Sequence, residues 1–156
     1  MKFGAALHEG EKVEADRLST DADRALVQAI RADVARTYEF DKKLLETLVK
    51  DCDWGLAWRR VQRMKAVFAG TEYEAKANAD VARLEANPVV AYVRPAQDQY
   101  DALIDQYAKA RTKKDVESLL TAVRNFADRY VNTKPGDRAA QWIPAIEKRL
   151  AELSAK

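Results

Sequence analysis

"FAGT" (Phe68–Thr71) and "YVNT" (Tyr130–Thr133) lie sixty-two residues apart and share one chemical pattern. Each begins with an aromatic residue and ends with threonine, and the residue before the threonine is Gly70 or Asn132. Glycine and asparagine are the residues that most readily take the left-handed conformation at a helix C-terminus. Threonine is favoured at helix N-termini. The two stretches therefore predict one device used twice, in which a helix ends, the chain reverses and a second helix returns.

Apolar residues continue this correspondence on both sides of the turns. They recur every three or four positions, which is typical of one face of a helix. The matched pairs at the same offset are Tyr38/Tyr100, Val61/Val123, Met64/Phe126, Ala77/Ala139, Val81/Ile143 and Leu84/Ile146. We therefore expect two related units, residues 19–87 and 88–156, preceded by an N-terminal arm, residues 1–18, that shows no clean periodicity.

Several local signals set the expected helix ends. Ser19 or Thr20 begins a helix that runs to about Lys50, and a break near Phe40-Asp41 stays open because Asp41 would place a charge on the apolar stripe. Thr71 and Glu74 have the spacing of a capping box.

The second unit differs from the first in its prolines. Pro95 predicts a kink or a restart of the helix, and Pro144 predicts a bend near Trp142. We expect Asp137 to start the helix that follows Thr133.

Composition limits the class of protein. The chain has 156 residues, 47% of them hydrophobic and 33% charged, which is typical of a globular protein. Its net charge is +2, and neither half is basic enough to indicate a nucleic-acid partner. Cys52 is the only cysteine, which excludes an intramolecular disulfide and favours a small, half-buried apolar role. No segment resembles a signal peptide or a membrane span. We expect a soluble protein without membrane insertion, and the compartment, cytoplasmic or periplasmic, stays open.

The paired helices and their turns resemble tetratricopeptide-like (TPR-like) repeats of the kind found in bacterial cell-envelope accessory proteins. The residues that carry this resemblance are "WGLAWRRVQRMKAVFAGTEYEAKANADVARLEANP" and "VESLLTAVRNFADRYVNTKPGDRAAQWIPAIEKRL". It implies an all-α helical-repeat stack of six to seven antiparallel helices that serves as a protein-binding scaffold. It transfers no individual functional residue.

Catalytic chemistry finds little support in the sequence. His8 is the only histidine and lies in the expected arm, and no phosphate-binding loop or nucleophile elbow is present. The carboxylates around Asp80 and Asp101 lie opposite apolar stripes, which is typical of solvated helix faces. We expect no enzyme activity, no catalytic residue, no metal and no cofactor.

Aromatic and basic residues give the candidate partner-binding surface. Tyrosines one or two helical turns apart predict a groove for a peptide or helix, with core packing as the alternative. Arginines beside a tryptophan favour a protein interface or a phosphate, with a solvated face as the alternative. The candidate residues are Tyr92, Tyr100, Tyr107, Trp58, Arg59, Arg60 and Arg63. A second basic cluster, Lys109, Arg111, Lys113 and Lys114, suits the negative end of a helix.

The leading functional interpretation is a non-enzymatic adaptor that binds a protein or peptide, with self-association as a further expectation for a short stack. One alternative is a helical accessory domain cut from a larger protein, such as a thioredoxin-like envelope protein. Another is binding of RNA or an anionic surface through Arg59, Arg60 and Arg63, which would be strongly salt-dependent.

Overall fold

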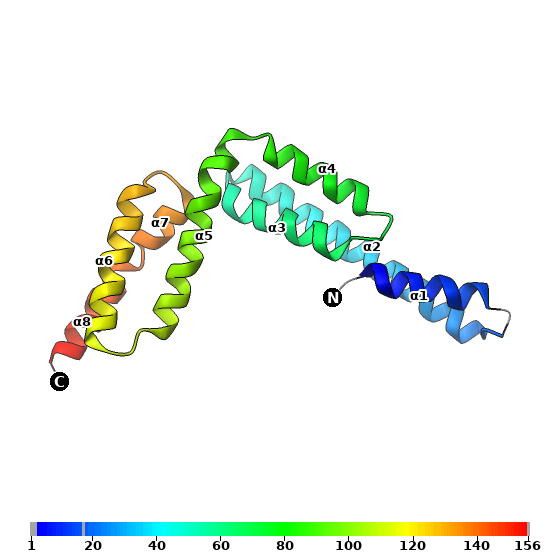
Figure 1. Ribbon diagram of the computed structural model, residues 1–156, viewed down its shortest axis with the longest axis horizontal. Helices are drawn as coiled ribbons and strands as arrows, with labels where there is room; N and C mark the ends of the chain where they lie inside the picture. Colours follow the sequence, from blue (N-terminus) through cyan, green and yellow to red (C-terminus); the bar gives the residue numbers. More distant parts are fainter. Residues whose placement is uncertain (1–2, 17, 156) are drawn as a thin grey trace. The chain divides into compact units, whose positions relative to one another are not determined.

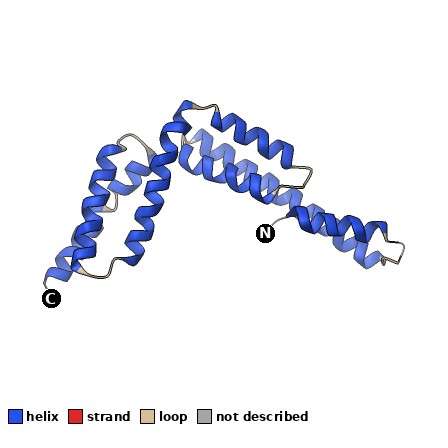
Figure 2. Cartoon of the chain, in the orientation of Figure 1, coloured by secondary structure: helices blue, strands red, loops and turns tan. Residues whose placement is uncertain are grey.

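The computed structural model describes residues 3–16 and 18–155, and all regular structure within them is helical (Figures 1 and 2). This confirms the all-α class. The chain divides after Asn87 into two compact units. The helices are α1 (Phe3–Ala15), α2 (Asp21–Lys50), α3 (Trp54–Val67), α4 (Glu74–Glu85), α5 (Pro88–Lys109), α6 (Lys113–Arg129), α7 (Lys134–Ala140) and α8 (Ile143–Ser154).

The first unit is built around the long helix α2. Helix α1 packs against α2, α3 packs against α2, and α4 returns along α3 (Figure 1). The core includes Leu45 of α2, Val61 and Met64 of α3, and Phe68 at the end of α3, all with no exposed surface. These are the positions that the apolar stripes place on the inner faces.

The expected N-terminal arm, residues 1–18, contains helix α1, which corrects that expectation; residues 1, 2 and 17 lie outside the described residues. Two glycines bring α1 close to its neighbours. A Cβ atom on Gly4 would lie 2.3 Å from the carbonyl oxygen of Ala69, and one on Gly10 would lie 3.0 Å from Cγ1 of Val27. Because glycines occupy contact positions that a periodicity search expects to be apolar, the sequence pattern missed this helix.

Helix α2 continues unbroken past Asp41, whose side chain lies in the core with 2% of the residue exposed. Arg60 of α3 donates a hydrogen bond from Nη1 to Oδ1 of Asp41 at 2.7 Å, and this ion pair neutralises the carboxylate. The other carboxylate oxygen, Oδ2, has no hydrogen-bond partner among the described residues. The ion pair therefore allows the charged side chain of Asp41 to lie on the apolar face of α2, which it was expected to interrupt.

A second buried aspartate joins α2 to α4. Nζ of Lys42 donates to both carboxylate oxygens of Asp80, at 2.7 and 2.8 Å, and Arg83 lies 3.3 Å from the same group. Asp80 is 6% exposed. Its position opposite an apolar stripe predicted a solvated face, and the structure corrects this because Lys42 reaches across from the neighbouring helix.

In the second unit, α6 is the central helix and packs against α5, α7 and α8, while α5 also contacts α7 (Figure 1). Its core cluster includes Tyr100, Val123, Phe126 and Ile146. Helix α5 runs through Pro95 without a restart. The chain is interrupted instead at Gln141-Trp142, so Pro144 occupies the first turn of a new helix, α8, where a proline is well tolerated.

The two chain reversals share a left-handed residue and a side-chain hydrogen bond. Gly70 and Asn132 take positive φ angles of 74° and 65°. In each turn, the threonine hydroxyl that follows donates to the carbonyl oxygen of the aromatic residue at 2.7 Å, from Thr71 to Phe68 and from Thr133 to Tyr130. The aromatic side chain is buried in both turns. The local device is therefore used twice, while the stacking of two units as repeats stays a prediction.

The helices that follow the two turns begin differently. Helix α4 starts at Glu74, and the Glu74 carboxylate accepts a hydrogen bond from the backbone N–H of Gly70 at 2.8 Å, so the expected capping box at Thr71 is displaced. Helix α7 is capped by Thr133, whose hydroxyl accepts from the N–H of Gly136 at 3.1 Å. Asp137 is therefore inside this helix and does not start it.

Substitution of Arg60 by alanine should destabilise the protein by about 3 kcal/mol, because it strands the buried carboxylate of Asp41. Adding Asp41→Leu should recover most of that loss, since sixty-two residues further on the second unit has Leu103 and Ala122 at the corresponding positions. Urea unfolding followed by circular dichroism measures both changes. Arg36→Ala, which breaks an exposed pair with Asp33, is the control and should cost less than about 1 kcal/mol. Equal losses for Arg60→Ala and Arg36→Ala would contradict this role.

Substitution of Thr133 by valine should cost about 1–2 kcal/mol, because valine keeps the shape of threonine but removes both hydrogen bonds of its buried hydroxyl. Thr121→Val is a matched control, since Thr121 lies exposed in the middle of α6 and bonds only its own helix. Thermal unfolding of the two variants gives the comparison. A Thr133→Val variant as stable as Thr121→Val would show that the turn does not depend on the hydroxyl.

Candidate functional site

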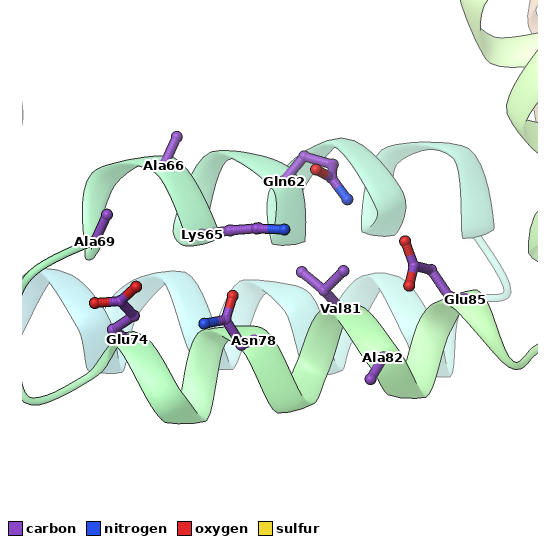
Figure 3. Close-up of a pocket in the computed structure, with 9 residues that line it drawn as sticks. All are labelled: Gln62, Lys65, Ala66, Ala69, Glu74, Asn78, Val81, Ala82 and Glu85. Carbon is purple, nitrogen blue, oxygen red and sulfur yellow. The ribbon is translucent and has the colours of Figure 1, made fainter.

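An open groove of about 830 Å³ runs between α3 and α4 in the first unit (Figure 3). Figure 3 shows Glu74, Asn78 and Glu85 pointing from α4 toward α3, with Lys65 extending between the two helices. Three of the residues that line the groove are alanines. Its lining residues are Gln62, Lys65, Ala66 and Ala69 from α3 and the turn after it, and Glu74, Asn78, Val81, Ala82 and Glu85 from α4. We call it the α3/α4 groove.

The second unit has a comparable groove between α5 and α6. It consists of two hollows of about 310 and 280 Å³, which adjoin at Gln106 because that residue lines both. From α5 and its end come Gln99, Ala102, Leu103, Gln106, Lys109 and Ala110. From α6 come Asp115, Ser118, Leu119, Ala122, Asn125, Phe126 and Arg129. We call it the α5/α6 groove.

Carboxamide side chains are concentrated in these two grooves. The sequence has six glutamines and four asparagines, and half of these ten residues line a groove: Gln62, Asn78, Gln99, Gln106 and Asn125. None of the five forms a side-chain hydrogen bond to another residue that the structure describes. Each carboxamide carries two N–H donors and a carbonyl acceptor. The grooves therefore present donors and acceptors that a bound molecule can use.

Sequence reasoning missed these carboxamides because isolated amides on polar helix faces look like ordinary solvated residues. The spacing of Gln99, Gln106 and Asn125 carries a weak signal. Gln99 and Gln106 are seven residues apart and so share one face of α5, and Asn125 lies on the helix that packs beside it. Only the pairing of the helices shows that the three side chains line one groove.

The carboxylate in the α5/α6 groove serves the start of α6. Oδ2 of Asp115 accepts hydrogen bonds from the backbone N–H of Thr112 at 2.8 Å and of Arg111 at 3.1 Å. These bonds, led by the one from Thr112, lower the pKa of Asp115 below its ordinary value. Asp115 is therefore a capping residue that stays ionised, and its charge is directed toward its own helix.

The tyrosines expected to line a groove are divided between core and surface. Tyr100 is only 8% exposed and packs against Phe126 and Trp142, with ring centroids 6.2 and 5.0 Å away, and burial raises its pKa. This placement corrects the expected surface position. Tyr92 is 57% exposed and touches the ring of Tyr130 at one edge.

Tyr107 is 40% exposed and lies against Trp142, with Arg149 above its ring. It therefore belongs to the margin of the aromatic core. Tyr92, Tyr100 and Tyr107 do not line either groove.

The arginines of α3 also have different surroundings. Arg60 is the ion-pair partner of Asp41, so its expected role at a partner surface is replaced by a structural one. Arg59 and Arg63 are exposed, and Trp58 is half-buried. None of these four lines the α3/α4 groove.

Reactive residues are dispersed. His8 is exposed on α1, 3.6 Å from Glu11, and Cys52 is exposed in a left-handed conformation at the corner between α2 and α3, which corrects its expected half-buried position. Within residues 3–16 and 18–155, no three His, Cys, Asp or Glu side chains are grouped as metal ligands. Over the same part of the chain, no helix has both the length and the apolar character needed to cross a membrane.

No protein-family model, curated protein sequence or solved protein structure matches this chain.

Proposed function

We propose that this protein is a non-enzymatic binding module that engages a protein or peptide segment in its interhelical grooves. The observation that carries this proposal is the set of five groove carboxamides without a hydrogen-bond partner among the described residues. A peptide main chain offers an N–H donor and a C=O acceptor at nearly every residue. Carboxamides can pair with both groups, so their chemistry matches a polypeptide whatever its side chains.

The remaining lining residues support recognition. Alanines at Ala66, Ala82, Ala102 and Ala122 keep the grooves open enough for a second chain to approach. The lining side chains contain no histidine or cysteine, and the carboxylates of Glu74 and Asp115 each accept a hydrogen bond from backbone N–H groups. This lining suits hydrogen bonding and shape recognition better than bond-breaking chemistry. The resemblance to TPR-like scaffolds fits the same proposal.

Selection from a displayed library of random twelve-residue peptides, with the full chain as bait, tests this function. We expect enriched peptides whose binding weakens at least about tenfold when one groove is filled, by Ala82→Trp in the α3/α4 groove or Ala102→Trp in the α5/α6 groove, a loss of about 1.4 kcal/mol or more. Ala79→Trp and Ala108→Trp are matched controls, since both alanines are exposed on the same helices but outside the linings.

Fluorescence anisotropy of the labelled peptides gives the dissociation constants for all four variants. Circular dichroism checks that each variant is folded. Failure of any peptide to enrich, or equal binding to the filled-groove variants and the controls, would contradict the proposed function.

A further inference from the structure

The charges that line the α5/α6 groove are predominantly positive. Lys109 lies toward one end and Arg129 toward the other, and neither forms an ion pair with another residue that the structure describes. The guanidinium of Arg129 lies over the ring of Tyr130, 5.3 Å from its centroid, which favours one orientation of the side chain. Asp115 is the one acidic residue of this lining, and its carboxylate is held by backbone N–H groups.

The end of the α5–α6 connection and the first turn of α6 extend this positive surface beyond the groove. Arg111, Lys113 and Lys114 are all exposed there. Lys113 lies 4.0 Å from the carboxylate of Glu117, and the charge of Lys114 helps to lower the pKa of Asp115. The aspartates of α5, Asp98, Asp101 and Asp105, are outside the lining of the groove.

We propose that the α5/α6 groove binds an extended peptide segment that carries acidic side chains. This inference rests on the proposed function and names the class of segment that this groove takes. The segment lies along α6 between Arg129 and the basic first turn of that helix, with its carboxylates at Arg129 and Lys109 and its main chain against the three groove carboxamides.

The carboxamides favour an extended segment over a helix. In a helix the backbone N–H and C=O groups bond to each other and are not available to Gln99, Gln106 or Asn125. An extended segment leaves them available. Gln99 and Gln106 are about 10.5 Å apart along α5, at about 1.5 Å per residue. Three residues of an extended chain, at about 3.3 Å each, span this separation.

The lining also favours a peptide over single-stranded nucleic acid. Proteins that bind single strands combine positive charge with exposed aromatic rings on which bases stack. Phe126 is the aromatic residue of this lining, and it is only 5% exposed. The groove therefore offers positive charge and hydrogen bonds without a stacking surface.

Sequencing of the enriched random peptides and measurement of their binding to groove variants test this inference. The triple variant Gln99→Met/Gln106→Met/Asn125→Leu removes the carboxamides and nearly keeps their size, and Gln62→Met/Asn78→Leu is the matched control in the α3/α4 groove. Arg129→Gln removes the positive charge at one end of the groove. Arg124→Gln is its control, because Arg124 lies on the same helix outside the lining and is paired with Glu147. A labelled twelve-residue oligouridine is the nucleic-acid probe.

We expect the enriched peptides to be rich in Asp and Glu, with no helical periodicity, and to bind the triple variant at least about tenfold more weakly. Arg129→Gln should weaken binding about fivefold at low salt, with a smaller effect at high salt because the interaction is electrostatic. The two control variants should bind like the unsubstituted protein. Oligouridine should bind more weakly than the enriched peptides.

Three results would overturn the inference, and they separate it from the proposed function. Peptides that are not acidic, or that lose binding only in the α3/α4 control variant, would remove the inference and leave the proposed function standing. Oligouridine that binds more tightly than the peptides and depends on Arg129 would replace the peptide by a nucleic acid. Absence of any enriched peptide would contradict both proposals.

Discussion

The hydrogen bond from a threonine hydroxyl to the carbonyl oxygen of a buried aromatic residue anchors both halves of this protein. It closes the turn in which Gly70 or Asn132 takes a left-handed conformation, and it does so at 2.7 Å in each unit. In the first unit this turn sets α4 against α3 and so creates the α3/α4 groove. In the second it directs α7 back along α6 and completes the core against which α5 and α6 form their groove. The two grooves thus depend on a local backbone reversal that threonine and a left-handed residue make favourable.

The two units use different chemistry at positions that lie sixty-two residues apart in the sequence. Asp41 and Arg60 form a buried ion pair in the first unit, and Leu103 and Ala122 stand sixty-two residues further on in the second. A buried ion pair and a well-packed apolar pair are often similar in net stability, whereas a single member of the ion pair is costly without the other. The ion pair also explains why Arg60, which resembled a surface residue in the sequence, has a structural role: its charge pairs with the carboxylate of Asp41 on the neighbouring helix.

Much of the fold could be predicted from the sequence because local signals carried it. The left-handed positions, the threonines and the apolar stripes of α3 and α6 follow from short-range preferences that a sequence displays directly. Helix α1 escaped prediction because Gly4 and Gly10 provide close contacts that have no apolar periodicity. The candidate site was harder to predict. The packing of the helices against one another decides whether Tyr100 faces a groove or the core. It also decides whether three carboxamides share one groove. A single sequence does not show which helices pack together.

The proposed role of the two grooves depends most on their carboxamides having no hydrogen-bond partner among the residues that the structure describes. The exchange of their side-chain amide protons with water, measured by nuclear magnetic resonance on the protein without ligand, tests this directly. Gln97 is an internal reference, because it is 2% exposed and its Nε2 donates to Asp101 at 3.1 Å. We expect side-chain exchange at the rates of free amides for the five groove residues, Gln62, Asn78, Gln99, Gln106 and Asn125, and far slower exchange for Gln97. Groove carboxamides as protected as Gln97 would show that they bond within the fold, and this would contradict the account.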